Sequence, residues 1–169
     1  MLLQVSRLLQ DNTHRLIPSA YDEETVLNRL ATDSDELIAL SELEGATNER
    51  LLGEAGLLPG ITIRDLVFGV SYSHVVNAAF THTNPLGNRF NGPERGAWYA
   101  AFSLETAGVG VAFHKAEGLR EINWQEKESF LCADFREEFH DIREDFGSAK
   151  YLDPTSYAAS QKLAGELTD

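Results

Sequence analysis

Apolar residues recur at helical spacing in the first third of the chain. Leu37, Leu40 and Leu43 are each three residues apart, and this spacing predicts a helix that Asp33 or Ser34 caps. Further short helices are predicted over residues 2–10, 22–31 and 48–54.

Extended segments are predicted where the helical pattern fails. Pro18 disfavours a helical conformation at Ile17, so residues 14–19 are predicted to be extended. Residues 97–102 form a short apolar run typical of a buried strand, and residues 129–136 alternate as a second strand does.

Two helices are predicted in the second half. Ser103 is a candidate N-cap for a helix that runs to about Lys115, and Asp153 with Pro154 predicts the start of a last helix over 154–166. Helices followed by mixed elements predict an α+β fold. We expect one domain, with a helical N-terminal part at 1–60 and the core at 61–169.

Composition narrows the class of protein. The chain has 169 residues, of which 43% are hydrophobic, enough for one domain with a buried core. No run of 18 apolar residues exists, which argues against a membrane-spanning helix. The one cysteine, Cys132, excludes a disulfide framework. These features predict a soluble cytoplasmic domain, with Cys132 as an inert core residue.

Charge is strongly acidic but uneven. The net charge is −13, which disfavours direct binding to nucleic acid. Residues 61–115 hold 4 basic and 3 acidic side chains, net +1, whereas the segments on either side are each net −7. The middle segment is therefore where an anionic ligand meets least repulsion, and the acidic flanks suit a basic protein partner.

The middle segment also contains the candidate chemistry. Arg89 lies in a loop rich in glycine, proline and asparagine, where a guanidinium can bind a phosphate or carboxylate. By residue type alone, an ordinary arginine paired with Glu94 and a core Tyr99 are the simpler interpretations. The five histidines lack the spacing of metal ligands, so no metal site is predicted. Gly108 and Gly110 lie inside a predicted helix, where each costs roughly 1 kcal/mol relative to alanine.

Several short motifs together resemble the RES domain family. They are Asn77-Ala78-Ala79-Phe80, Gly87-Asn88-Arg89-Phe90-Asn91, Gly96-Ala97-Trp98-Tyr99-Ala100-Ala101, Leu104-Glu105-Thr106-Ala107 and Val111-Ala112-Phe113-His114. The resemblance covers most of residues 14–169, and the segment that begins at His14 resembles the opening strand of the family.

The resemblance implies a fold similar to ADP-ribosyltransferases and a toxin of a type II toxin–antitoxin system. Such a toxin degrades NAD+ as a glycohydrolase or phosphorylase at the nicotinamide–ribose bond. Two alternatives stay open, namely a protein ADP-ribosyltransferase and a non-catalytic module that binds NAD+ or the antitoxin. The implied partners are NAD+ and an Xre-type antitoxin, with a homodimer as a further expectation.

The resemblance also assigns residues. It places the pyrophosphate contact on Arg89, a stacking ring on Tyr99 and a second basic contact on Arg15, with Asn91 as a further contact to NAD+. Two departures stand out. The glutamate of the family falls on Gly110, and the chain ends before the C-terminal strand that carries the serine of the family. These departures predict an inactive or weakened form.

Overall fold

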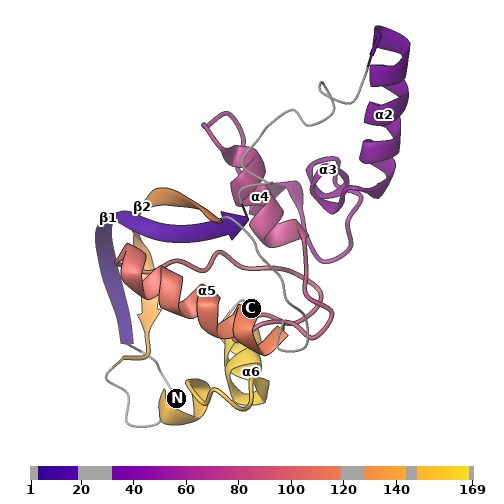
Figure 1. Ribbon diagram of the computed structural model, residues 1–169. Coiled ribbons are helices and arrows are strands. Elements are labelled where there is room, and N and C mark those ends of the chain that lie inside the picture. Colours follow the sequence, from indigo (N-terminus) through magenta and orange to yellow (C-terminus); the bar gives the residue numbers. More distant parts are fainter. Residues whose placement is uncertain (1–3, 19–31, 119–127, 144–147, 168–169) are drawn as a thin grey trace. The chain divides into compact units, whose positions relative to one another are not determined.

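The computed structural model describes residues 4–18, 32–118, 128–143 and 148–167 (Figure 1). The chain divides into two compact units. Met1–Glu23 and Tyr99–Ser148 form the first, which we name the sheet unit, and Glu24–Trp98 and Ala149–Asp169 form the second, the helical unit. Each unit is therefore built from two separate stretches of sequence.

The sheet unit is built on two long antiparallel strands, β1 (Gln4–Pro18) and β2 (Glu128–Asp141). The register is irregular between Gln10 and Thr13, where Asn12 adopts a left-handed φ of 57° and its backbone N–H donates to Asp134 at 2.9 Å. Ala101 adds an isolated bridge to His14, with N···O distances of 2.7 and 2.9 Å.

Helix α5 (Leu104–Gly118) packs against β1 in this unit (Figure 1). The hydroxyl of Ser103 accepts from the backbone N–H of Thr106 at 3.1 Å, which confirms Ser103 as the cap, and the helix runs three residues beyond Lys115. At Gly108 an added Cβ would touch Leu16 Cδ1 at 4.0 Å, which places α5 in van der Waals range of the strand.

The strand predictions have mixed outcomes. The extended conformation at 14–18 and the strand over 129–136 are confirmed, whereas the helix over 2–10 is wrong because residues 4–10 pair with β2. Residues 97–100 form no strand, and Phe102 is 56% exposed. The prediction of a buried strand over 97–102 is therefore wrong, because within this segment only Ala101 forms a β-bridge, to His14.

The helical unit holds four of the described α-helices. They are α2 (Ser34–Thr47), α3 (Glu49–Glu54), α4 (Ser73–Thr81) and α6 (Ala158–Leu167), with short 3-10 turns at η2 (Ile63–Asp65) and η3 (Ser148–Tyr151). The Asp33 carboxylate accepts from the backbone N–H groups of Asp35 and Glu36, so its predicted role as a cap is confirmed. The short helix at 48–54 is likewise confirmed, with Asn48 as its cap.

The last helix begins later than predicted. The Asp153 carboxylate accepts from the backbone N–H of Thr155 at 2.8 Å and from its hydroxyl at 2.7 Å. This side chain thus closes a turn instead of capping a helix, and α6 starts at Ala158. The prediction of a cap at Asp153 and a first helical residue at Pro154 is wrong for this reason.

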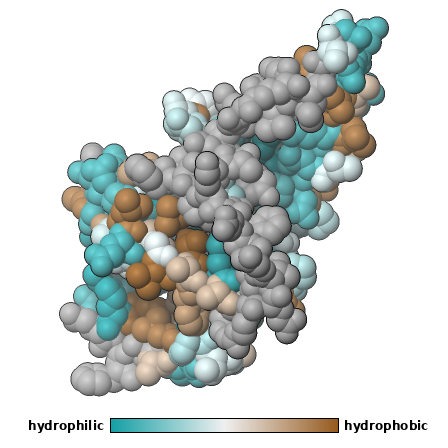
Figure 2. Space-filling model, viewed as in Figure 1, coloured by the Kyte–Doolittle hydropathy of each residue, from teal (hydrophilic) through white to brown (hydrophobic). Residues whose placement is uncertain are grey.

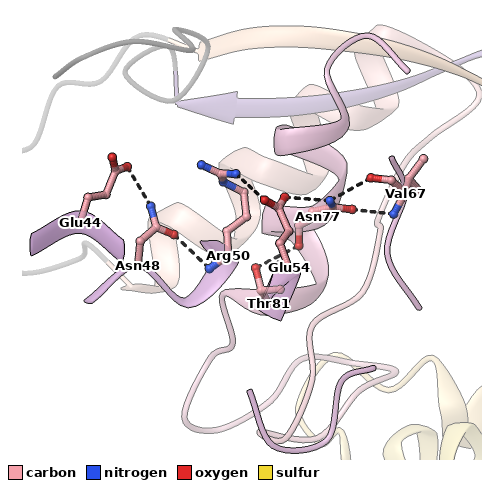
Figure 3. Close-up of polar contacts among 7 residues, drawn as sticks. All are labelled: Glu44, Asn48, Arg50, Glu54, Val67, Asn77 and Thr81. Carbon is pink, nitrogen blue, oxygen red and sulfur yellow. Dashed lines mark hydrogen bonds and ion pairs between the residues drawn. The ribbon is translucent and has the colours of Figure 1, made fainter. Parts of the chain in front are cut away.

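A buried polar network connects α3, α4 and the segment between them (Figure 3). The Asn77 side chain, only 1% exposed, donates to Glu54 at 2.8 Å and to the Val67 carbonyl at 2.9 Å, and it accepts from the Val67 N–H at 2.8 Å. Arg50 donates to the same Glu54 carboxylate at 3.0 Å. Every polar group of the Asn77 amide is satisfied, so its burial stabilises one arrangement of these elements.

Helix α2 differs from the rest of its unit because none of its residues is buried. Ile38 and Leu43 are exposed among acidic side chains, and the helix shows hydrophobic and hydrophilic surface side by side (Figure 2).

The observed architecture is a mixed α+β fold, as predicted. The predicted helix at 22–31 lies outside the described residues. In the part of the chain that the structure describes, no helix is long and apolar enough to cross a membrane.

Candidate functional site

The loop that carries Arg89 is a tight turn closed by its own backbone. Asn88 and Asn91 form an isolated bridge, and the Gly87 N–H donates to the Asn84 carbonyl at 2.7 Å. Gly87 has a φ of 67°, and a Cβ there would collide with the Asn91 carbonyl oxygen. Glycine is thus required at the position two residues before Arg89.

Asn91 holds the second half of this loop. Its side-chain amide is buried and donates to the Gly92 carbonyl at 3.0 Å and to the Arg95 carbonyl at 2.8 Å. The structure therefore gives Asn91 a role in shaping the loop, beside the predicted role in contacting NAD+.

Arg89 is half-buried and bonded to the segment before α6. Its Nη1 donates to the Asp153 carbonyl at 2.9 Å and to the Tyr151 carbonyl at 3.5 Å. Its guanidinium carbon lies 4.9 Å from the centre of the Tyr157 ring, within the range of a cation–π contact. Glu94 makes no ion pair with Arg89 among the described residues, so the simple pairing expected from residue type is wrong.

Two further charges lie in this part of the helical unit. Hydrogen bonds from Thr155 lower the pKa of Asp153, and the positive charge of Arg89 lowers it further. Lys150 Nζ lies 4.6 Å from the centre of the Tyr151 ring. The segment from Tyr151 to Tyr157 thus gives Arg89 two backbone carbonyls, one aromatic ring and one nearby carboxylate.

The other predicted site residues belong to the sheet unit. Arg15 lies on β1, and its Nη1 donates to the Tyr99 carbonyl at 3.2 Å, so the structure brings these two residues together. Burial lowers the pKa of Arg15, while the nearby Tyr99 opposes this shift. The Tyr99 side chain is 39% exposed, so the interpretation of Tyr99 as a core residue in a buried strand is wrong.

Gly110 lies in the middle of α5 with open space where a side chain would begin, since no heavy atom comes within 4 Å of an added Cβ. Nothing in its surroundings requires glycine. A Cβ is therefore accommodated at this position without a clash.

Cys132 is not the core residue that its apolar neighbours predict. It is exposed on β2, and its Sγ lies 3.6 Å from Nδ1 of His14, its cross-strand partner. Across the described ranges, no group of three or more His, Cys, Asp or Glu side chains could hold a metal ion.

Sequence reasoning missed Tyr157 and Gln161. Gln161 Nε2 donates to the carbonyls of Asn88 at 2.9 Å and Leu86 at 3.3 Å, on either side of Gly87. The two residues are four apart, the spacing that places side chains on one helical face. That spacing was the available signal, but it does not reveal which loop they meet.

A comparison with protein-family models matches residues 64–169 to the RES domain. No curated protein and no solved structure matches the chain. The match is narrower than the predicted 14–169, because it begins after Arg15 but includes Arg89, Asn91, Tyr99 and Gly110.

RES domains are a family of toxins, generally NAD-degrading enzymes, and the family suggests pairing with an antitoxin. The match spans more than half of the chain, and the motif residues lie in a mixed α+β fold. The chain therefore belongs to the RES domain family.

Proposed function

We propose that this chain is a RES-type toxin that binds NAD+ and cleaves it weakly or not at all. The observation that carries the proposal is the geometry of Arg89 within a RES domain. The guanidinium is held through Nη1, and Nε and Nη2 make no hydrogen bond or ion pair within the described ranges. That edge has the shape that binds two oxygens of a phosphate.

The proposed role of Arg89 is to bind the pyrophosphate of NAD+. Asn91 supports this contact by holding the loop, and the near-neutral charge of residues 61–115 allows the anion to approach. In the sheet unit, we assign Tyr99 to the nicotinamide side of NAD+ and Arg15 to a second basic contact. The hydrogen bond from Arg15 to the Tyr99 carbonyl supports a joint role of these two residues.

The proposed reaction breaks the bond between C1′ of the ribose and the nicotinamide nitrogen. The bonding electrons leave with nicotinamide, which departs as a neutral molecule, and positive charge develops on the ribose. Water or phosphate then adds to C1′ and loses a proton. A carboxylate near the ribose stabilises this charge and orients the nucleophile.

Gly110 is the reason to expect weak activity. By family resemblance this position carries the carboxylate, and glycine supplies none. The same observation favours a second candidate, a module that binds NAD+ or its antitoxin without turnover. The proposed antitoxin is of Xre type and carries any DNA binding itself, because a net charge of −13 disfavours contact with phosphates.

The test is calorimetric titration of the chain with NAD+, alongside the Arg89→Ala variant. We expect binding that weakens about 10- to 100-fold in the variant, the usual effect of losing a charge-assisted hydrogen-bond pair. Arg64→Ala, which removes an exposed arginine of the same unit, is the control and should bind normally. Equal affinity in all three proteins would contradict the assignment of Arg89.

A further inference from the structure

Arg89 uses only part of its hydrogen-bonding capacity inside the helical unit. A guanidinium has five N–H donors, two of them on Nη1. Those two face the carbonyls of Asp153 and Tyr151 at 2.9 and 3.5 Å. The Nε–H and both Nη2–H groups make no hydrogen bond among the residues that the structure describes. The Nε–Nη2 edge of the guanidinium is therefore available to a ligand.

Tyr157 fixes the plane of this guanidinium. Its ring centre lies 4.9 Å from the guanidinium carbon. Its own backbone is fixed in turn, since the Tyr157 carbonyl accepts from Ser160 Oγ at 3.0 Å and from the Gln161 N–H at 2.9 Å. Ser160 lies in the first turn of α6 and is completely buried, so this turn fixes the backbone of Tyr157.

Gln161 fixes the backbone from which Arg89 projects. Its side-chain amide donates to the carbonyls of Leu86 and Asn88, which flank the left-handed Gly87. Gln161 of α6 thus holds the loop, and Tyr157, the residue just before α6, holds the guanidinium. A guanidinium constrained at both ends loses little conformational entropy when it binds an anion.

We infer that Tyr157 and Gln161 are positioning residues that present the Nε–Nη2 edge of Arg89 to a phosphate-type oxyanion. This inference rests on the proposed function, in which Arg89 binds the pyrophosphate of NAD+. It adds that binding depends on the planar fork of arginine and on the ring beneath it, and not on positive charge alone.

The experiment titrates the full chain with NAD+ and, separately, with inorganic pyrophosphate. Tyr157→Leu removes the aromatic face, and we expect about 5- to 30-fold weaker binding of both ligands, the range of a cation–π contact. Tyr157→Phe keeps the face and serves as the matched control, with affinity within about twofold of the wild type. Arg89→Lys keeps the charge but loses the fork, so it should bind as poorly as Arg89→Ala.

The outcomes separate the two proposals. A Tyr157→Leu variant that binds as tightly as the wild type, or an Arg89→Lys variant that retains wild-type affinity, overturns the positioning role. Binding of pyrophosphate through Arg89 without binding of NAD+ overturns the proposed substrate and leaves the positioning role in place. A wild-type chain that binds neither ligand overturns both.

Thermal denaturation distinguishes positioning from loss of fold. If Tyr157→Leu does not fold, Gln161→Leu tests the same role from the loop side and should weaken binding of both ligands. Lys162→Ala, at an exposed position of the same helix, is its control and should not change the affinity. Equal affinity of Gln161→Leu and Lys162→Ala for pyrophosphate would contradict the role of α6.

Discussion

The helical unit buries residues from both of its stretches of sequence, including Asn77, Thr81 and Ser160, whereas the sheet unit buries only Thr13 and Ile17 among its described residues. The helical unit therefore depends on side-chain packing and a buried polar network. The sheet unit depends on a long backbone ladder of two strands, an arrangement that is marginal by itself. Arg89 and Asn91 belong to the helical unit, and Arg15 and Tyr99 belong to the sheet unit.

The difference between the two units affects how firmly each one holds its predicted site residues. Arg89 is constrained by hydrogen bonds and a ring from rigid neighbours, whereas Tyr99 lies 39% exposed in a segment without regular structure. We therefore expect Arg89 to hold a more precise geometry within its own unit than Tyr99 does within the sheet unit.

The largest effect is expected at Gly110. A Gly110→Glu variant restores a carboxylate where open space accepts it, and we expect the rate of nicotinamide release from NAD+ to rise about 10²- to 10³-fold. Val109→Glu adds the same charge at the neighbouring exposed position and should give no gain. Equal rates for the two variants would contradict the assignment of position 110.

The next largest effect is expected in the buried network. Asn77→Ala removes three hydrogen bonds and leaves the Val67 backbone without its partner, so we expect a loss of about 2–3 kcal/mol in the free energy of unfolding. Urea denaturation measures this loss. Asn84→Ala, in an exposed turn, is the control, and a loss no greater than that of the control would show that the network contributes little.

A smaller effect is expected in the sheet unit. The buried Thr13 hydroxyl donates to the Ala133 carbonyl at 2.8 Å, and Thr13→Val removes this bond while keeping the β-branched shape. We expect a loss of about 1 kcal/mol, which urea denaturation also measures. A loss of unfolding free energy as large as that of Asn77→Ala would contradict the idea that side-chain hydrogen bonds matter more in the helical unit than in the sheet unit.

The smallest effect is expected from pH. Hydrogen bonds from Arg143 lower the pKa of Asp141 below its ordinary 3.8, and bonds from Thr62 lower that of Asp65. A carboxyl with a lowered pKa stabilises the folded state fully above its ordinary pKa and loses that contribution as pH falls through the lowered value. The melting temperature should therefore fall below about pH 4, and Asp141→Asn should reduce the fall. If the melting temperature of Asp141→Asn fell with pH as steeply as that of the wild type, Asp141 would not contribute to acid sensitivity.

Local signals predicted α2 and α3 of the helical unit, whereas α4 was not predicted. Asp33 caps its helix by short-range hydrogen bonds, as predicted, and the glycine-rich loop has a clear turn composition. The position of Arg89 was likewise predictable from its motif. Its carbonyl partners near Asp153 were not, because they lie more than 60 residues away in sequence.

The sheet unit was harder to predict for a specific reason. In β1 the less exposed positions are Ser6, Leu8 and Gln10 before the irregularity, but Thr13 and Ile17 after it. The alternation thus changes phase inside one strand, and no single period of two describes it. The β2 residues that pair with β1 lie at least 110 positions away in sequence.

The extra residue in β1 also determines how this strand tolerates changes in length. Asp11 and Asn12 together face Asp134, because Gln10 pairs with Phe135 and Thr13 pairs with Ala133. Deletion of Asn12 would leave Asp11 alone opposite Asp134 and make the ladder continuous, and residues 4–10 would keep their β2 partners and their faces. Deletion of one residue elsewhere in β1 would turn the side chains on one side of the deletion to the opposite face, whereas deletion of the extra residue is absorbed at the irregularity.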